Sequence, residues 1–262
     1  MSVLPTMNQA IRDWTGQRIW IIGASSGIGA ALARHALAAG AQVVLSARRV
    51  EHLRRVADGH PASLVLPLDV LDHSAWSTAY RHIVAQWGGV DLLFFCAADY
   101  RPERCWEVGI AAAELTLRIN LTSVYGGLAT VLPDMLARGS GGVALVASVA
   151  GYMGLPNASV YGPSKAALIN LAEILYADLH PKRLNVYLIN PGFVKTELTE
   201  KNEFPMPGLQ TPQQAAIAIL KGIEQGRFEI HFPKRFTAIM KLVQLLPYRL
   251  RFALFAHFLK TP

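Results

Sequence analysis

A tyrosine and a lysine four residues apart have the spacing needed for acid–base chemistry. Tyr161 and Lys165 lie near the start of a predicted helix, 160–180, and residues at positions i and i+4 share one face of a helix. Because a neighbouring ammonium stabilises a phenolate, we expect Lys165 to lower the pKa of Tyr161 from about 10 toward neutral pH. Ser148, at the end of a predicted strand, has a hydroxyl that could polarise a carbonyl. The Tyr-x-x-x-Lys spacing alone is a frequent coincidence, so this interpretation requires a cofactor site nearby.

A glycine-rich loop supplies that site. The run Gly23-Ala24-Ser25-Ser26-Gly27-Ile28-Gly29 follows a predicted strand, 18–22, and opens an alanine-rich helix, 27–39. Glycines there let the backbone approach a pyrophosphate, and the helix directs its first N–H groups at the negative charge. The loop therefore predicts a dinucleotide site, with an ordinary strand–helix turn as the alternative.

The end of the second predicted strand, 42–46, distinguishes the two nicotinamide cofactors. A carboxylate there would bind the ribose 2′-hydroxyl of NAD, but this chain has Arg48 and Arg49 and no acid before Glu51. Guanidinium groups pair with phosphate through charge-assisted hydrogen bonds, and Ser25 could add a hydroxyl. We therefore expect NADPH or NADP+ rather than NAD, with a solvated arginine pair as the alternative.

Asp69 follows the third predicted strand, 63–67, with Val70 next to it. This position allows the Asp69 side chain to meet the adenine of the cofactor. A helix N-cap is the alternative, because a helix begins nearby at His73.

The rest of the chain alternates short apolar runs with helical ones. Further strands are predicted at 91–95, 142–146, 185–189 and 228–231, and further helices at 50–57, 73–87, 111–136 and 211–224. Strands that are apolar on both faces and alternate with helices indicate a parallel sheet covered on both sides. We expect a single-domain α/β fold with a Rossmann-type doubly wound sheet of about seven strands. Its dinucleotide-binding and catalytic part spans 1–232, and 233–262 forms a helical extension of the same domain.

Composition excludes several other classes. Only 16% of residues are charged and 52% are hydrophobic, so disorder is not expected. Cys96 and Cys105 are too few for a disulfide framework, and no zinc-type Cys/His spacing is present, so we expect reduced thiols and no metal. Arg12 and Asp13 interrupt the only candidate for a signal peptide, which favours a cytoplasmic protein.

The C-terminal region is apolar and basic. From 227 to 262 there are seven Lys or Arg residues and one acid, Glu229, so most of the net charge of +7 lies there. Two short helices, 236–246 and 248–259, are predicted around Pro247. They could form a substrate-pocket wall or subunit interface, lie on a membrane surface, or simply pack on the parent domain. A pocket wall or interface, and likewise a membrane contact, would favour a bulky apolar substrate such as a lipid, steroid or fatty ketone. We expect no nucleic-acid partner.

Taken together, these motifs resemble the short-chain dehydrogenase/reductase family from about 17 to 196. The matches, in order, are Gly23-x-x-x-Gly27-Ile28-Gly29, Asp69, Asn120, Ser148, Tyr161-x-x-x-Lys165 and Pro191-Gly192-x-x-x-Thr196. The resemblance implies hydride transfer between NADPH and a carbonyl or alcohol substrate in a homo-oligomer, either a dimer or a tetramer. A non-catalytic NADP-binding protein or a membrane-associated interaction protein is the alternative.

The resemblance also assigns roles. Asn120 would hold a helix bend and a water that links Lys165 to solvent, and Lys165 would also hydrogen-bond the nicotinamide ribose. Residues 200–209 would form a substrate lid. The catalytic set is then Asn120, Ser148, Tyr161 and Lys165. The cofactor would contact Gly23, Ser25, Ser26, Gly27, Ile28, Gly29, Arg48, Arg49, Asp69, Val70, Ala97, Tyr161, Lys165, Pro191, Gly192, Val194 and Thr196.

Two departures from the family pattern stand out. Ile22 replaces the usual threonine before the first glycine, and Phe95-Cys96-Ala97-Ala98 replaces the usual Asn-Asn-Ala-Gly. We expect backbone contacts of the second segment to persist, with an effect on stability or cofactor affinity. Cys96 is not interpreted as a nucleophile, because apolar neighbours raise the pKa of a thiol.

Overall fold

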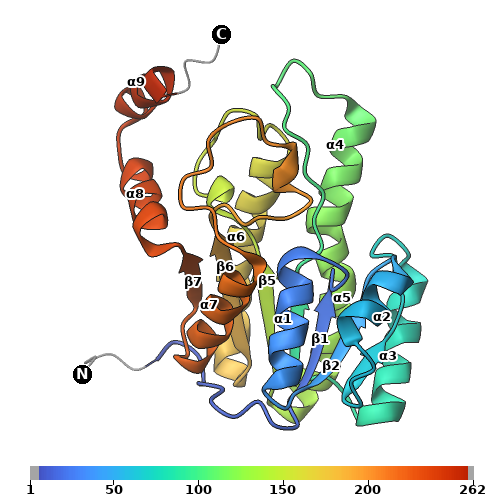
Figure 1. Cartoon of the computed structure of the whole chain (residues 1–262). Coiled ribbons are helices and arrows are strands. Elements are labelled where there is room, and N and C mark those ends of the chain that lie inside the picture. The colour runs from blue at the N-terminus through green and yellow to red at the C-terminus, as the bar shows by residue number, and fades with distance from the viewer. Residues whose placement is uncertain (1–5, 259–262) are drawn as a thin grey trace.

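The computed structural model describes residues 6–258, in which seven strands form one parallel sheet (Figure 1). The strands are β1 (Arg18–Ile22), β2 (Gln42–Ser46), β3 (Ser63–Val65), β4 (Leu92–Phe95), β5 (Gly142–Val146), β6 (Asn185–Pro191) and β7 (Glu229–Phe232). Their order in the sheet is β3-β2-β1-β4-β5-β6-β7. The predicted parallel doubly wound sheet is confirmed, with small changes at strand ends. The predicted end of the second tail helix, at 259, lies outside the described residues.

Helices cover both faces of the sheet. They are α1 (Gly27–Ala38), α2 (Val50–Ala57), α3 (His73–Trp87), α4 (Ile110–Leu117), α5 (Ser123–Arg138), α6 (Tyr161–Leu179), α7 (Pro212–Glu224), α8 (Lys234–Gln244) and α9 (Tyr248–Phe258). Side chains of α1, α2 and α7 pack with one face of the sheet, and those of α3, α5 and α6 pack with the other. Because both faces are buried, the strands carry apolar residues at successive positions, which is the pattern seen in the sequence.

The order of the strands places the topological switch point of the sheet, where a ligand crevice is expected, at the carboxyl ends of β1 and β4. The chain winds from β1 outward to β3 and then returns to β4 on the other side of β1. In the sheet register, Ile22 lies beside both Ser46 and Phe95, so these three strands end at one rim. Ligands bind at this kind of switch point in open parallel sheets.

The long helix predicted at 111–136 is interrupted. A π-helical turn, Arg118–Thr122, separates α4 from α5, and Asn120 lies inside it. Both amide atoms of Asn120 bind the backbone of Asp99, which holds the widened turn in place. An apolar periodicity does not reveal such a turn, because the helix pattern continues on either side of it.

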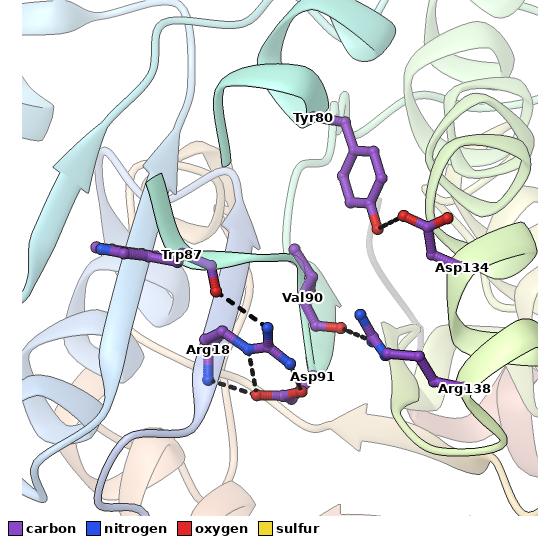
Figure 2. Close-up of polar contacts among 7 residues, drawn as sticks. All are labelled: Arg18, Tyr80, Trp87, Val90, Asp91, Asp134 and Arg138. Carbon is purple, nitrogen blue, oxygen red and sulfur yellow. Dashed lines mark hydrogen bonds and ion pairs between the residues drawn. The ribbon is translucent and has the colours of Figure 1, made fainter. Parts of the chain in front are cut away.

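A polar network stabilises the opposite, amino-terminal end of the sheet (Figure 2). The Arg18 Nε donates a hydrogen bond of 2.8 Å to the Asp91 carboxylate, and Arg18 Nη1 donates one of 3.0 Å to the Trp87 carbonyl. Arg138 of α5 donates to the Val90 carbonyl. These bonds connect β1, the start of β4 and α5 away from the crevice, so their role is structural.

The C-terminal helices extend from the sheet edge at β7 (Figure 1). Phe236 of α8 packs on Phe193, with ring centroids 5.6 Å apart, and Lys241 pairs with Glu229 of β7. The helix α9 lies farther from the sheet and exposes large apolar side chains, including Tyr248, Leu250 and Phe252. Within residues 6–258, no helix is long and apolar enough to cross a membrane.

Candidate active site

Ser148, Tyr161 and Lys165 converge at the carboxyl end of β5. Tyr161 is the first residue of α6, and the Lys165 Nζ lies 5.5 Å from the centre of its ring. Lys165 is buried and its Nζ donates a 2.8 Å hydrogen bond to the carbonyl oxygen of Val146. The Ser148 hydroxyl accepts a hydrogen bond from the Ala150 N–H and also interacts with the Tyr161 phenol. The three predicted groups therefore share one site.

The electrostatics of this site correct one expectation. Burial raises the pKa of Tyr161 to about 12, and the hydrogen bond with Ser148 opposes this shift only in part. Burial also lowers the pKa of Lys165 to about 8. The expected lowering of the Tyr161 pKa is therefore wrong for the protein alone, because desolvation penalises both charged forms. Tyr161 is a protonated phenol at neutral pH, which suits a proton donor.

Asn120 holds the backbone on two sides of the site. Its Oδ1 accepts a 2.7 Å hydrogen bond from the Asp99 N–H, and its Nδ2 donates to the Asp99 carbonyl and to Ser164 Oγ. Ser164 in turn donates to the carbonyl of Tyr161. Asn120 thus connects the segment after β4 with the first turn of α6. Its water-linked role toward Lys165 stays a prediction.

The glycine loop after β1 has the close approaches of a phosphate cradle. Gly23 has φ +87°, and a Cβ atom there would lie 2.6 Å from the Ala97 nitrogen. A Cβ on Gly29 would lie 2.3 Å from the Gly23 carbonyl oxygen. A side chain at Gly23 would push away the segment after β4, and one at Gly29 would force the turn of the loop itself to open. The backbone of Ala97 thus lies against the loop, and the pyrophosphate site and the cofactor contact of Ala97 stay predictions.

Arg49 lies across this loop. Its guanidinium donates to Ser26 Oγ at 2.8 Å and to Ser25 Oγ at 3.3 Å, and it forms an ion pair of 3.0 Å with Glu197. Arg48 is exposed next to it. Ser25 and Ser26 therefore both contact Arg49, and Glu197 is a partner that the sequence did not indicate.

Asp69 and Val70 follow β3 at the same rim. The Asp69 carboxylate accepts a 3.0 Å hydrogen bond from the Leu71 N–H and is otherwise exposed. The N-cap alternative for Asp69 is wrong, because Asp72 caps α3 by accepting from the Ser74 N–H. Asp69 and Val70 stay candidates for an adenine contact.

The segment after β6 faces the glycine loop. A Cβ atom on Gly27 would lie 3.0 Å from the Thr196 Cγ2, so these two predicted residues adjoin. The Gly192 N–H donates to the Phe232 carbonyl, Pro191 is buried at the end of β6, and Val194 is buried and paired with Gln210. This anchoring holds 191–196 along one wall of the crevice.

The packing of Phe95 accounts for its presence at the position where the family pattern has asparagine. Its ring is buried against Trp76, with centroids 5.7 Å apart, and a Cβ on Gly127 would lie 2.3 Å from its Cζ. The ring therefore occupies space left by a glycine of α5. Cys96 follows, and burial raises the pKa of its thiol to about 12, which agrees with an unreactive cysteine.

Tyr100 and Ser164 are site residues that the sequence analysis did not identify. Tyr100 packs its ring against Tyr161 with centroids 4.8 Å apart, and Ser164 connects Asn120 to Tyr161. An aromatic residue shortly after a strand end at the ligand rim was the available signal for Tyr100. Ser164 has no comparable signal, because a serine in a helix is unremarkable.

The chain is similar to several known proteins. The family model described as short chain dehydrogenase matches residues 17–205. An uncharacterized oxidoreductase of Myxococcus xanthus is 33% identical over 231 residues, 87% of this chain and 91% of its own. The trans-4-hydroxycyclohexanecarboxylate dehydrogenase of Sinomonas cyclohexanicum is 28% identical over 200 residues, 72% of this chain and 77% of its own.

Solved structures show the same fold. A short-chain dehydrogenase/reductase from Burkholderia phymatum in complex with NAD is 24% identical, with a TM-score of 0.81. The alignment covers 88% of this chain and 94% of that one.

Proposed function

Because this chain belongs to the short-chain dehydrogenase family and is an oxidoreductase of that family, we propose that it transfers hydride between NADP(H) and a carbonyl or alcohol substrate. The observation that carries the proposal is the convergence of Ser148, Tyr161 and Lys165 beside a glycine cradle. A bound NADPH supplies the hydride for reduction, and NADP+ accepts it for oxidation. The chain itself supplies orientation and the proton.

Each side chain has a distinct part in this chemistry. Ser148 holds the substrate oxygen by a hydrogen bond, and Tyr161 donates its phenolic proton to that oxygen as the carbonyl is reduced. Lys165 provides a positive charge near the phenol and would also hydrogen-bond the nicotinamide ribose. Asn120 fixes the backbone on which Tyr161 lies. The reverse oxidation uses the same groups with Tyr161 as the base.

The preference for NADP(H) rests on Arg49. Its guanidinium already bonds the hydroxyls of Ser25 and Ser26, so three donors face the region expected to receive a 2′-phosphate. Arg48 adds a second positive charge beside it. No carboxylate from β2 lies at this position to bind a 2′-hydroxyl, which supports NADP(H) over NAD.

An apolar substrate is supported by the aromatic wall beside the crevice. Phe193 packs against Phe204 at 5.9 Å and against Phe236 at 5.6 Å between ring centroids. The three rings come from the segment after β6, the lid expected at 200–209, and α8. Such a wall favours a bulky apolar carbonyl compound, such as a fatty ketone, lipid or steroid, over a sugar.

Turnover with a matched variant tests the activity. The purified protein is mixed with NADPH and a panel of fatty ketones, aldehydes, steroids, sugars and quinones, and NADPH consumption is followed. We expect Tyr161→Phe to reduce the rate by about 100- to 10,000-fold, since it removes the proton donor. NADPH binding should persist in the variant. Turnover that survives Tyr161→Phe contradicts the mechanism, whereas tight NADPH binding without any turnover favours a non-catalytic NADP-binding protein.

The tail favours a second property, contact with an anionic membrane surface. In α8, α9 and the turn between them, Leu242, Leu245 and Tyr248 are each at least 65% exposed. Five Lys or Arg residues and no acid lie between 234 and 258. Apolar side chains flanked by cations suit the interface of a bilayer with anionic headgroups. The packing of Phe236 on Phe193 supports α8 as a pocket wall at the same time, so a lipid-derived substrate could enter from that surface.

Vesicle sedimentation tests this contact. We expect the protein to bind vesicles of phosphatidylglycerol and phosphatidylcholine, and to bind pure phosphatidylcholine weakly. Leu245→Ser with Tyr248→Ser should reduce binding, while Ile217→Ser, also exposed but on α7, should not. If the tail variants instead change only the oligomeric state, then α9 is a subunit interface and the membrane proposal is wrong.

The proposal also covers the oligomeric state of the protein and its location in the cell. A homo-oligomer, either a dimer or a tetramer, is supported by the exposed Tyr125 of α5 and Ile174 of α6, since large apolar side chains on adjacent helices favour association. A cytoplasmic location, with the tail on the membrane surface, is supported by the free thiols Cys96 and Cys105.

A further inference from the structure

Tyr100 lies next to the catalytic tyrosine although it belongs to a loop. It follows β4 by five residues, is only 9% exposed, and presents its ring at 67° to that of Tyr161 with centroids 4.8 Å apart. Edge-to-face packing at this distance restricts both rings. Tyr100 therefore packs directly against the ring that carries the Tyr161 phenol.

Two bonds connect Tyr100 to a segment one hundred residues later. Its hydroxyl donates a 2.7 Å hydrogen bond to Asn202 Oδ1, and its carbonyl accepts one of 2.7 Å from Lys201 Nζ. Both partners lie at the end of the short turn Thr199–Lys201, within the stretch expected to be the substrate lid. The Asn202 amide also contacts Met206 Sδ at 3.5 Å, so the interaction extends further along this stretch.

The backbone on the other side of Tyr100 is rigidly held. Asn120 binds both the N–H and the carbonyl of the preceding residue, Asp99. The Asp99 carboxylate accepts a 2.6 Å hydrogen bond from the buried Thr116. Tyr100 is therefore a fixed point beside Tyr161, and the segment 199–206 is attached to it through side chains.

We propose that Tyr100 is a substrate-positioning residue, which holds the segment 199–206 closed over Tyr161 through its bond to Asn202. Closing this segment completes the apolar wall that includes Phe204, against which the substrate would lie. Opening it requires breaking this neutral hydrogen bond, the Lys201 contact and the packing of Phe204 on Phe193. The consequence for catalysis rests on the proposed function, but the attachment itself does not.

Burial raises the pKa of Tyr100, so the hydroxyl remains protonated and able to donate. Replacing it with phenylalanine keeps the ring packing on Tyr161 and deletes only the bond to Asn202. Asn202→Ala deletes the same bond from the other side, together with the contact between the Asn202 amide and Met206 Sδ. Asn202→Ala should therefore have at least the effect of Tyr100→Phe, and the double variant should add nothing beyond Asn202→Ala.

Hydrogen–deuterium exchange of the protein without substrate tests the attachment. We expect amides of 199–206 to exchange roughly fivefold faster in Tyr100→Phe, the factor for one net neutral hydrogen bond, and at least that much faster in Asn202→Ala and in the double variant. Tyr125→Phe, an exposed tyrosine of α5, is the matched control and should leave exchange unchanged. Exchange in 199–206 that matches wild type in both variants overturns the proposal, and so does an additive double variant.

Kinetics test the consequence for substrate. With NADPH and decanal as the probe, we expect Tyr100→Phe to raise KM about fivefold while kcat stays within about twofold, since the hydroxyl holds the wall and not the proton. A fall in kcat with unchanged KM would contradict a positioning role. If wild type does not turn over decanal, the proposed activity is in question for this compound class, and the exchange result alone decides the role of Tyr100.

Discussion

The Lys165 ammonium donates its hydrogen bond to the carbonyl oxygen of Val146, 2.8 Å away, while lying 5.5 Å from the centre of the Tyr161 ring. Lys165 is thus a buried cation with no carboxylate partner among residues 6–258, and the burial lowers its pKa to about 8. The buried charge of Lys165 lowers the free energy of unfolding of the protein. A destabilising charged group of this kind is typical of a functional site.

Lys165→Met should therefore stabilise the protein and abolish turnover. Below about pH 8 the folded lysine carries a buried charge that the unfolded chain carries in water, so replacing it should raise the free energy of unfolding by about 1–2 kcal/mol near pH 7. This stabilisation by Lys165→Met should decrease between about pH 8 and pH 10. In that range the wild-type lysine is already neutral in the folded state but still protonated in the unfolded chain.

Urea unfolding at neutral and alkaline pH measures this difference. Lys195→Met, at an exposed position beside the same wall, is the control and should change stability little. A destabilised Lys165→Met at neutral pH would show that the bond to Val146 outweighs the burial penalty.

Arg49→Gln should weaken NADPH binding by about 10- to 100-fold, the range for losing charge-assisted hydrogen bonds to a phosphate. NADH binding should stay within about twofold, because NADH has no 2′-phosphate. Titration of cofactor fluorescence measures the dissociation constants of NADPH and NADH. Arg48→Gln is the comparison, and equal weakening of NADPH and NADH by Arg49→Gln would contradict a 2′-phosphate role.

Glu197→Gln should tighten NADPH binding by a few-fold. Glu197 now pairs with Arg49 at 3.0 Å, so it competes with the phosphate for the guanidinium. Both side chains are largely exposed, and such pairs are worth only about 0.2–1 kcal/mol, which limits the gain. The same titration measures it, and unchanged affinity would indicate that the pair breaks freely in solution.

Asp91→Asn should lower the free energy of unfolding by about 2 kcal/mol near neutral pH, because it removes charged hydrogen bonds with Arg18 (Figure 2). Burial alone would raise the pKa of Asp91, but the hydrogen bonds from Arg18 outweigh it and the pKa is lowered. The contribution is therefore present above the unfolded value of about 3.9 and is lost as pH falls below it.

Denaturant titrations over this pH range check the expectation. The difference in the free energy of unfolding between Asp91→Asn and wild type should become smaller as the pH is lowered. The exposed Asp58→Asn is the control, and a difference that is constant with pH would show that the Asp91 charge is not responsible.

Gly127→Ala should destabilise the protein by about 1–3 kcal/mol, since its Cβ would lie 2.3 Å from Phe95 Cζ and 3.0 Å from Trp76 Cζ3. Phe95→Leu should relieve part of this cost, so the double variant should lose less than the sum of the single ones. Gly154→Ala, which faces open space, is the control. Additive losses, measured by thermal or urea unfolding, would contradict the packing argument.

Much of the site follows from local pattern. The glycine loop, Ser148 and the Tyr161–Lys165 pair each lie at the carboxyl end of a strand or the start of a helix, and parallel strands bring such ends to one rim. Tyr100 and Asn202 show where this reasoning stops. Their bond joins two loops a hundred residues apart, and no periodicity relates loops that meet only after the sheet has formed.

By itself, the sequence determined the order of strands and helices, the parallel sheet, and the residues that reach its ligand rim. These depend on apolar periodicity and short-range spacing, which act locally along the chain. Only the tertiary structure decided the protonation of Tyr161 and Lys165, the π-turn at Asn120, the pairing of Arg49 with Glu197, and the exposure of α9. Each of those depends on burial and on contacts between distant segments, which only the folded chain creates.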